Sequence, residues 1–231
     1  MSGAPLDRLR RVPGRSRLAE ALGVYVILDV DTLAGRSLLD VAQAVIQGGA
    51  GAVQLRAKRW DGGQVLEAAR RIRPLAEAAG VLFIVNDRVD VAWLAGAGGV
   101  HLGESDIPVA EARRLLGPDA VIGFSPDDLD SARRAVLAGA DYLGVGPAYG
   151  TATKPDAGPA IGPEGVGAVA RALPVPVVGI GGINAANAAA VIAAGACGVA
   201  VASAVLRAPD VSRAVHDLAL AVRAPRSGRV P

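Results

Sequence analysis

Residues 175–203 read VPVVGIGGINAANAAAVIAAGACGVAVAS. Two short apolar runs, 175–182 and 198–203, enclose an Ala-rich segment that begins and ends near glycines and asparagines. The uncharged region from 172 to 206 is long enough to cross a membrane. Prolines, glycines and asparagines interrupt it, so the pattern predicts a strand, a loop, a helix and a second strand inside a protein core.

The same unit repeats towards the N-terminus. Six earlier runs rich in Val, Ile and Leu are predicted strands: VYVILD at 24–29, AVQLR at 52–56, VLFIVND at 81–87, GGVHLG at 98–103, AVIGFS at 120–125 and DYLGVGPA at 141–148. The segments between them are rich in Ala, Arg and Leu at helical spacing. Strict alternation predicts an α/β fold with a parallel sheet covered by helices, and eight strands can close into a single (β/α)₈ TIM barrel.

A doubly wound open sheet is the rival fold. No predicted strand is followed by a G-x-G-x-x-G turn with an acid downstream, so the dinucleotide-binding fingerprint of that fold is missing. A length of 231 residues suits one barrel. We therefore predict a basic N-terminal extension at 1–20, a catalytic barrel domain at 21–223 and a C-terminal tail at 224–231. Residues 1–19 and those beyond Arg223 carry no motif, and we expect them to be peripheral or poorly ordered.

Composition narrows the class of partner. The net charge of +2 could favour nucleic acid, but the arginines are dispersed and no aromatic residues lie between them, so we expect no nucleic acid. Cys197 is the only cysteine and forms no internal disulfide. The basic N-terminus lacks a small-residue cleavage site after its short apolar run. We expect a cytoplasmic protein with no membrane segment; a homo-oligomer is compatible with the sequence.

Polar residues gather at the predicted strand ends, where the active site of such a barrel lies. Gln54, Arg56 and Lys58 are spaced by two and would point to one side of an extended segment. The only two lysines among 24 basic residues, Lys58 and Lys154, both follow strand ends. This usage favours compact ammonium groups placed for phosphate oxygens, whereas the alternative is a solvated loop.

Two acids follow neighbouring strands. Asp87 and Asp106 could together hold a Mg²⁺ that also takes diphosphate oxygens. Each has an alternative, since Asp87 could cap a helix that starts near Val89 and Asp106 could cap a turn at Pro108. The same capping alternative applies to Ser125, which precedes a proline.

Small residues end the last two predicted strands. Gly179, Gly181 and Gly182 follow strand seven, and Ala202 and Ser203 end strand eight, where many barrels bind a phosphate through backbone N–H groups. The alternative is close packing that requires small residues. His101, among apolar residues of a strand, is more typical of a packed core histidine than of a base.

Taken together, these motifs resemble the thiamine-phosphate synthase family over residues 22 to 208. The matching segments, in order, are Gln54-x-Arg56-x-Lys58, Asn86-Asp87, His101-Leu-Gly-Glu-Ser-Asp106, Gly123-Phe-Ser125, residues 146–156 (GPAYGTATKPD) and residues 179–184 (GIGGIN). Six segments in order on successive strands make a specific signal.

The resemblance implies an enzyme that joins a pyrimidine methyl diphosphate to a thiazole phosphate, or its carboxylated form, in the presence of Mg²⁺. The products are thiamine monophosphate and pyrophosphate. The implied magnesium ligands are Asp87 and Asp106. The implied pyrimidine diphosphate site comprises Gln54, Arg56, Lys58, Asn86, Ser125 and Lys154, of which Arg56, Lys58, Ser125 and Lys154 are also the implied catalytic residues. The implied thiazole phosphate site comprises Thr151, Thr153, Gly182, Ala202 and Ser203.

The expected chemistry agrees with these residues. Breaking a C–O bond to diphosphate leaves charge on the departing oxygens, which Mg²⁺ and the three cations would stabilise. The pyrimidine delocalises the methylene cation, so a dissociative substitution needs no protein nucleophile, and no Ser-His-Asp arrangement or reactive cysteine is evident.

Three positions depart from the family pattern: Asp127 where histidine is usual, Gly150 where proline is common, and Glu104 where glutamine is common. Asp127 would repel a diphosphate unless it were paired or turned away, or would cap the next helix. Two other functions remain as alternatives: a thiazole tautomerase on the same barrel, which has no diphosphate to hold, and a phosphate-binding barrel without catalysis.

Overall fold

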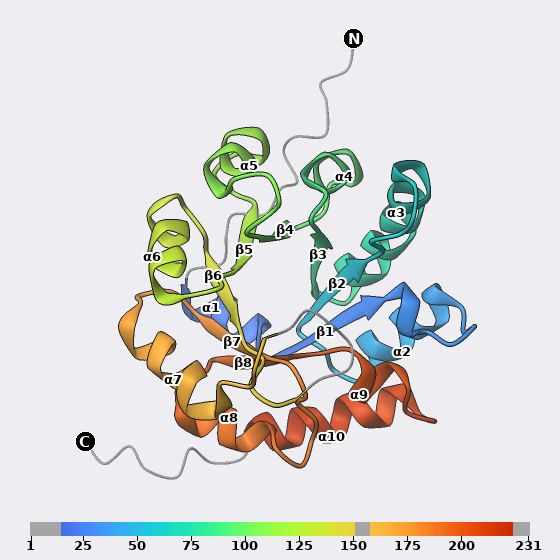
Figure 1. Cartoon of the computed structure of the whole chain (residues 1–231). Coiled ribbons are helices and arrows are strands. Elements are labelled where there is room, and N and C mark those ends of the chain that lie inside the picture. The colour runs from blue at the N-terminus through green and yellow to red at the C-terminus, as the bar shows by residue number, and fades with distance from the viewer. Residues whose placement is uncertain (1–14, 151–157, 224–231) are drawn as a thin grey trace.

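The computed structural model describes residues 15–150 and 158–223 (Figure 1). Eight parallel strands follow one another around a closed barrel in chain order. They are β1 (Val24–Asp29), β2 (Ala52–Arg56), β3 (Leu82–Asn86), β4 (Gly99–Gly103), β5 (Val121–Ser125), β6 (Tyr142–Val145), β7 (Val177–Ile180) and β8 (Gly198–Val201). Each observed strand lies within a predicted run, which confirms the (β/α)₈ barrel and excludes the open sheet.

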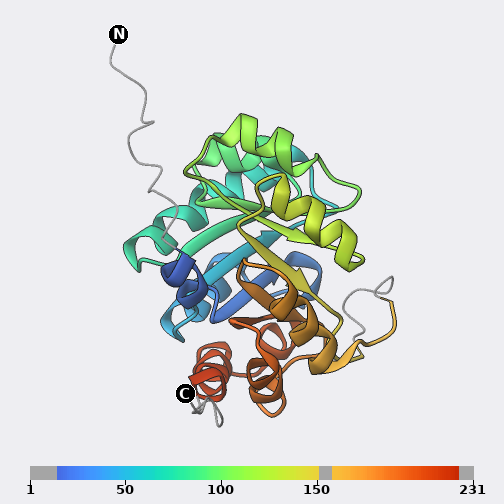
Figure 2. The same ribbon diagram turned by 90° about the vertical axis from the view of Figure 1, so that its left-hand side faces the viewer.

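Helices cover the outside of the barrel, as both views show (Figures 1 and 2). The helices in the described residues are α1 (Arg15–Ala21), α2 (Leu38–Gln47), α3 (Gly62–Ala78), α4 (Val89–Ala95), α5 (Val109–Leu116), α6 (Leu129–Leu137), α7 (Gly162–Ala172), α8 (Ala188–Ala194), α9 (Ser203–Leu206) and α10 (Val211–Arg223), with a short 3₁₀ turn at Val30–Thr32; α1 differs from the others in packing against the barrel interior. Among residues 15–150 and 158–223, no helix is both long enough and apolar enough to span a bilayer.

The apolar core has two parts. The larger part fills the space between strands and helices and takes alternate strand residues such as Val26, Leu28 and Val53. The smaller part fills the barrel itself with the residues that point inward, including Tyr25, Ile84 and Tyr142. This division is the expected result of side chains that alternate between the two faces of a strand.

Helix α1 belongs to the inner part of the core. Leu18 and Leu22 are fully buried and pack with the inward-facing strand residues. The expectation that the chain up to residue 19 is peripheral is therefore wrong for Leu18. The predicted boundary between residues 20 and 21 falls inside α1, whose amphipathic pattern is too short to be read from sequence.

Strand register brings the predicted polar residues to one end of the barrel. Asp29 lies opposite Arg56, Asn86 opposite His101, and Gly103 opposite Ser125. Parallel strands in this register present their C-terminal residues, and the loops that follow, around one rim.

Candidate active site

Lys58, Asp87 and Asp106 come together at the rim above β2, β3 and β4. The Lys58 Nζ atom lies 3.3 Å from Asp87 Oδ2. Burial raises the pKa of Asp87, and so do the charge of the Asp106 carboxylate and a hydrogen bond with it, whereas Lys58 acts in the opposite direction. Two partly buried carboxylates are thus held close with one lysine as compensation.

Hydrogen bonds to nearby backbone groups hold both acids in their loops, and neither acid caps a helix. Asp87 has a φ of 61°, a left-handed conformation that Asp tolerates, and its N–H donates to the His101 carbonyl oxygen (2.8 Å). The N-cap of α4 is Arg88 and that of α5 is Pro108. Asp106 Oδ2 instead accepts the Gly103 N–H (2.7 Å). Among the described residues no group of three or more His, Cys, Asp or Glu side chains is arranged to hold a metal, so these two acids are the donor set available.

Arg56 is held by an acid that the sequence analysis did not assign. Its Nη1 donates to Asp29 Oδ2 at 2.6 Å, while Asp29 Oδ1 accepts the Asp31 N–H. Asp29 is 3% exposed. The sequence does contain a signal for this ion pair, because Asp29 is the last residue of the first predicted strand and Arg56 is the last residue of the second.

Five side chains form a continuous run of hydrogen bonds through the barrel interior, which we call the polar chain: Gln54, Tyr25, Tyr142, His101 and Ser125. Gln54 Nε2 donates to the Tyr25 hydroxyl (2.5 Å), which lies 3.0 Å from the Tyr142 hydroxyl. His101 Nδ1 is 2.9 Å from the Tyr142 hydroxyl, and His101 Nε2 is 2.8 Å from Ser125 Oγ. His101 thus packs inside the barrel with a polar partner at each ring nitrogen. Ser125 does not cap α6, whose N-cap is Asp128.

The glycines after β7 have a packing explanation. Gly181 and Gly182 have φ of 91° and 64°, and a Cβ at Gly182 would lie 2.5 Å from the Gly150 carbonyl oxygen. The loop after β7 thus lies directly against the loop after β6, with Tyr149 N–H donating to the Gly181 carbonyl. This close approach accounts for glycine at both positions, and a phosphate-binding role for Gly182 stays a prediction.

Three further predicted residues that the structure describes lie around the same rim. Asn86 ends β3 and lines a cavity of about 120 Å³ together with Lys58 and Asp87. Ala202 and Ser203 follow β8, next to the loop that contains Gly182, since Ile180 pairs with Ala200. Thr151, Thr153 and Lys154 lie outside the described residues.

Two of the departures from the family pattern contact each other. The Asp127 N–H donates to Glu104 Oε1 (3.3 Å), and both residues are exposed. Of the alternatives for Asp127, capping of the next helix is excluded, because Asp128 accepts the Ser131 N–H in that role.

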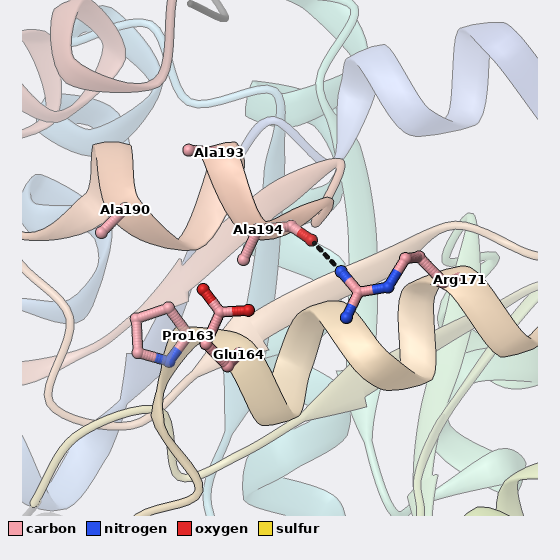
Figure 3. A pocket seen from close by; sticks show the side chains of 6 residues that line it. All are labelled: Pro163, Glu164, Arg171, Ala190, Ala193 and Ala194. Atoms are coloured by element: carbon pink, nitrogen blue, oxygen red, sulfur yellow. Dashed lines mark hydrogen bonds between the residues drawn. The ribbon is translucent and has the colours of Figure 1, made fainter. Parts of the chain in front are cut away.

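A larger cavity lies elsewhere, between α7 and α8 on the outer helical layer (Figure 3). It measures about 420 Å³, and its walls include Pro163, three alanines, Glu164 and Arg171. Arg171 Nη1 donates to the Ala194 carbonyl oxygen. Its charged lining residues are one acid and one base, so this cavity offers fewer charged groups than the rim.

Fold and rim together define a class: a (β/α)₈-barrel protein with an acid pair, cations and a polar chain at the C-terminal ends of its strands. The thiamine monophosphate synthase family model matches residues 24–205. The chain therefore belongs to the thiamine monophosphate synthase family, and it is an enzyme, a transferase of thiamine biosynthesis.

Individual relatives agree with this assignment. The chain is 47% identical to the thiamine-phosphate synthase of Moorella thermoacetica over 195 residues. This aligned region covers 84% of this chain and 93% of the relative. It is 51% identical over 225 residues to a thiamine biosynthesis bifunctional protein of Symbiobacterium thermophilum, but spans only 46% of that longer protein. The solved thiamine phosphate pyrophosphorylase of Pyrococcus furiosus superposes with a TM-score of 0.83 at 37% identity, covering 91% of this chain and all of that one.

Asp29, Tyr25 and Tyr142 were not predicted as part of the site, and His101 was predicted only as a packed histidine, without its polar partners. The chain has only three tyrosines, and two of them lie in predicted strands. The rarity of tyrosine could have drawn attention to these two residues. Their contact inside the barrel, however, depends on β1 and β6 facing one another, which the local sequence does not predict.

Proposed function

We propose that the rim joins a pyrimidine methyl diphosphate to a thiazole phosphate and releases pyrophosphate, with Mg²⁺ bound by Asp87 and Asp106. The observation that supports this proposal most directly is the pair of acids, Asp87 and Asp106. Asp87 ionises against burial and against the charge of Asp106, and Lys58 compensates only one negative charge. A divalent cation fits a donor set of two hard oxygen ligands with excess negative charge.

Bound at this position, Mg²⁺ would stabilise the negative charge that develops on the departing diphosphate. Arg56 is fixed by Asp29 at the end of β2, so its guanidinium is oriented before a substrate binds. Lys58, Asn86 and Ser125 would contribute donors from three further points of the rim, and Lys154 from the loop after β6. None of these residues needs to act as a nucleophile.

Thiazole phosphate would bind on another part of the rim, at Gly182, Ala202 and Ser203 with Thr151 and Thr153. The pairing of β7 with β8 supports this division, since their loops adjoin each other and are separated from those of β2 and β3 by β1 on one side and by β4, β5 and β6 on the other. The partners are thus small phosphorylated molecules, and we place the enzyme in the cytoplasm.

The test is pyrophosphate release by the purified protein. Release should require both substrates and Mg²⁺. Asp87→Asn should lower kcat/KM about 100-fold or more, because bound metal contributes several kcal/mol to catalysis. Asn tolerates the left-handed backbone at this position better than Ala would. The matched control is Asp217→Asn, which removes an acid paired with Arg213 on α10 and should leave activity unchanged. Thiazole phosphate binding without any pyrophosphate release would contradict the proposal.

A further inference from the structure

The polar chain is only partly explained by the proposed function. Its two ends, Gln54 and Ser125, are expected to contact the pyrimidine substrate. Its three inner members have no role in the proposed reaction, yet they are held by hydrogen bonds of 2.8 to 3.0 Å that cross the barrel between β1, β6, β4 and β5.

The barrel makes room for these inner members. A Cβ at Gly123 would lie 2.1 Å from the Tyr142 ring, so the ring occupies the space of a side chain at that position on β5. A Cβ at Gly144 would lie 3.2 Å from His101 Cε1 and 3.3 Å from Ser125 Oγ, at the junction of those two residues. Two glycines on adjacent strands thus leave space for the rings and for their contact with Ser125.

The orientation of the Gln54 amide sets one direction for the hydrogen bonds of the polar chain, provided that each buried hydroxyl donates its own proton. Gln54 Nε2 can only donate, so the Tyr25 oxygen accepts and its own proton goes to Tyr142. Burial raises the pKa of both tyrosines far above that of a phenol in water, so each hydroxyl keeps one proton.

The same counting of protons can be continued from Tyr142 to Ser125 at the rim. The Tyr142 oxygen accepts from Tyr25, so its proton goes to His101 Nδ1. An Nδ1 that accepts leaves the imidazole neutral with its proton on Nε2, and that proton is donated to Ser125 Oγ. The hydroxyl proton of Ser125 is then directed away from His101.

We propose that the three inner members of the polar chain are positioning residues, which transmit the donor direction set by Gln54 so that Ser125 presents its proton to the diphosphate. The inference rests on the proposed function, since it assumes that Ser125 contacts that substrate. No proton is transferred and no bond is broken along the chain. Its effect is to make Ser125 a donor to a phosphate oxygen, which offers no proton in return.

The histidine tautomer tests this directly and does not depend on activity. The protein contains two histidines, His101 and the exposed His216 on α10, so ¹⁵N-histidine labelling gives two imidazole patterns, and His216→Gln assigns them. Long-range ¹H–¹⁵N spectra at neutral pH should show His101 protonated on Nε2 alone. Protonation on Nδ1 alone, or on both nitrogens, would reverse the direction of donation and overturn the proposal.

Kinetics test whether the direction matters for catalysis. Tyr142→Phe keeps the ring and removes the hydroxyl that donates to His101. It should lower kcat/KM for the pyrimidine diphosphate about 10-fold, the effect of one misdirected hydrogen bond to a charged group, while KM for the thiazole phosphate stays unchanged. It should also let the His101 tautomer redistribute.

A double-mutant cycle separates positioning from simple structural support. If Tyr142 acts through Ser125, then Tyr142→Phe has little further effect in a Ser125→Ala background. Effects that multiply fully in the double variant, or a matching rise in KM for thiazole phosphate, would overturn the proposal. Should Tyr142→Phe fail to fold, the tautomer in the wild-type protein decides alone. A wild-type enzyme that releases no pyrophosphate would contradict the proposed function and leave the tautomer result standing as a separate measurement.

Discussion

Asp87 combines two unfavourable features at one residue. Its backbone is left-handed, and its carboxylate is partly buried beside Asp106. Strain of this kind persists where a site requires a particular geometry, because the stability of the surrounding fold compensates its free-energy cost. At this residue, stability and metal binding are therefore opposed.

The first prediction concerns Asp87→Asn and stability without metal. Because the folded-state pKa of Asp87 is raised, its ionised form destabilises the folded protein at neutral pH, and the neutral amide removes that cost. We expect the metal-free variant to unfold at a higher temperature than the wild type at pH 7. We also expect the stabilisation by Mg²⁺ seen in the wild type to be reduced.

The sign of the pH dependence follows from the same shift. A raised carboxyl pKa contributes stability that is present below the unfolded-state value and is lost as pH rises through the folded-state value. The advantage of the variant should thus shrink as pH falls and the wild-type carboxyl becomes protonated. Calorimetry at several pH values without divalent ions measures this, and a variant that is less stable than the wild type at pH 7 would refute it.

At the scale of elements, one arginine joins several loops at the end of the barrel opposite the site. Arg113, on α5, donates to the carbonyl oxygens of Gly117, Ala120 and Gly139, and its Nη2 lies 2.6 Å from Asp141 Oδ2. Asp141 Oδ2 also accepts the Ile122 N–H. These loops precede β5 and β6, so they support the fold and do not reach the rim.

The second prediction is that Arg113→Ala lowers the free energy of unfolding by about 2 kcal/mol, because it removes several hydrogen bonds to partly buried carbonyl oxygens and the ion pair with Asp141. The kcat/KM of the folded variant should stay within about 2-fold of wild type, since this end of the barrel is remote from the chemistry. Urea unfolding and a pyrophosphate assay measure the two effects. The neighbouring Arg114→Ala, which breaks an exposed pair with Glu111, is the control and should change neither.

The third prediction concerns α1. Leu18 is 1% exposed and lies in the inner cluster at the barrel's N-terminal end, so Leu18→Ala should cost about 2–4 kcal/mol of unfolding free energy through the cavity that it leaves. Leu137→Ala, at a leucine that is 88% exposed, is the matched control and should have little effect. Equal midpoints of unfolding for the two variants would show that α1 does not support the barrel.

For the whole molecule, the sequence predicts the barrel well and the site only in part. Alternation of buried runs and helices fixes the fold, and the strand-end rule finds Gln54, Arg56 and Asp87 because these depend on local order alone. The Asp29–Arg56 pair and the polar chain depend on which strands face or adjoin each other. The roles of the site residues stay predictions, including Thr151, Thr153 and Lys154 outside the described residues.

Barrel closure leads to the last prediction. β8 pairs with β1 to close the sheet, and a Cβ at Gly198, where β8 begins, would lie 1.9 Å from the Leu22 carbonyl oxygen and 2.7 Å from Gly23 Cα. Gly198→Ala therefore forces the connection between α1 and β1 away from β8 and weakens closure. We expect a loss of about 3 kcal/mol, the upper range for an overpacked core, in urea unfolding followed by circular dichroism. A Cβ at Gly63, in the first turn of α3, would meet no atom of the described residues within 4 Å, so Gly63→Ala should instead stabilise the protein by up to about 1 kcal/mol. If both variants unfold at the wild-type midpoint, the close approach at Gly198 does not limit closure, and the barrel tolerates displacement of α1 relative to β8.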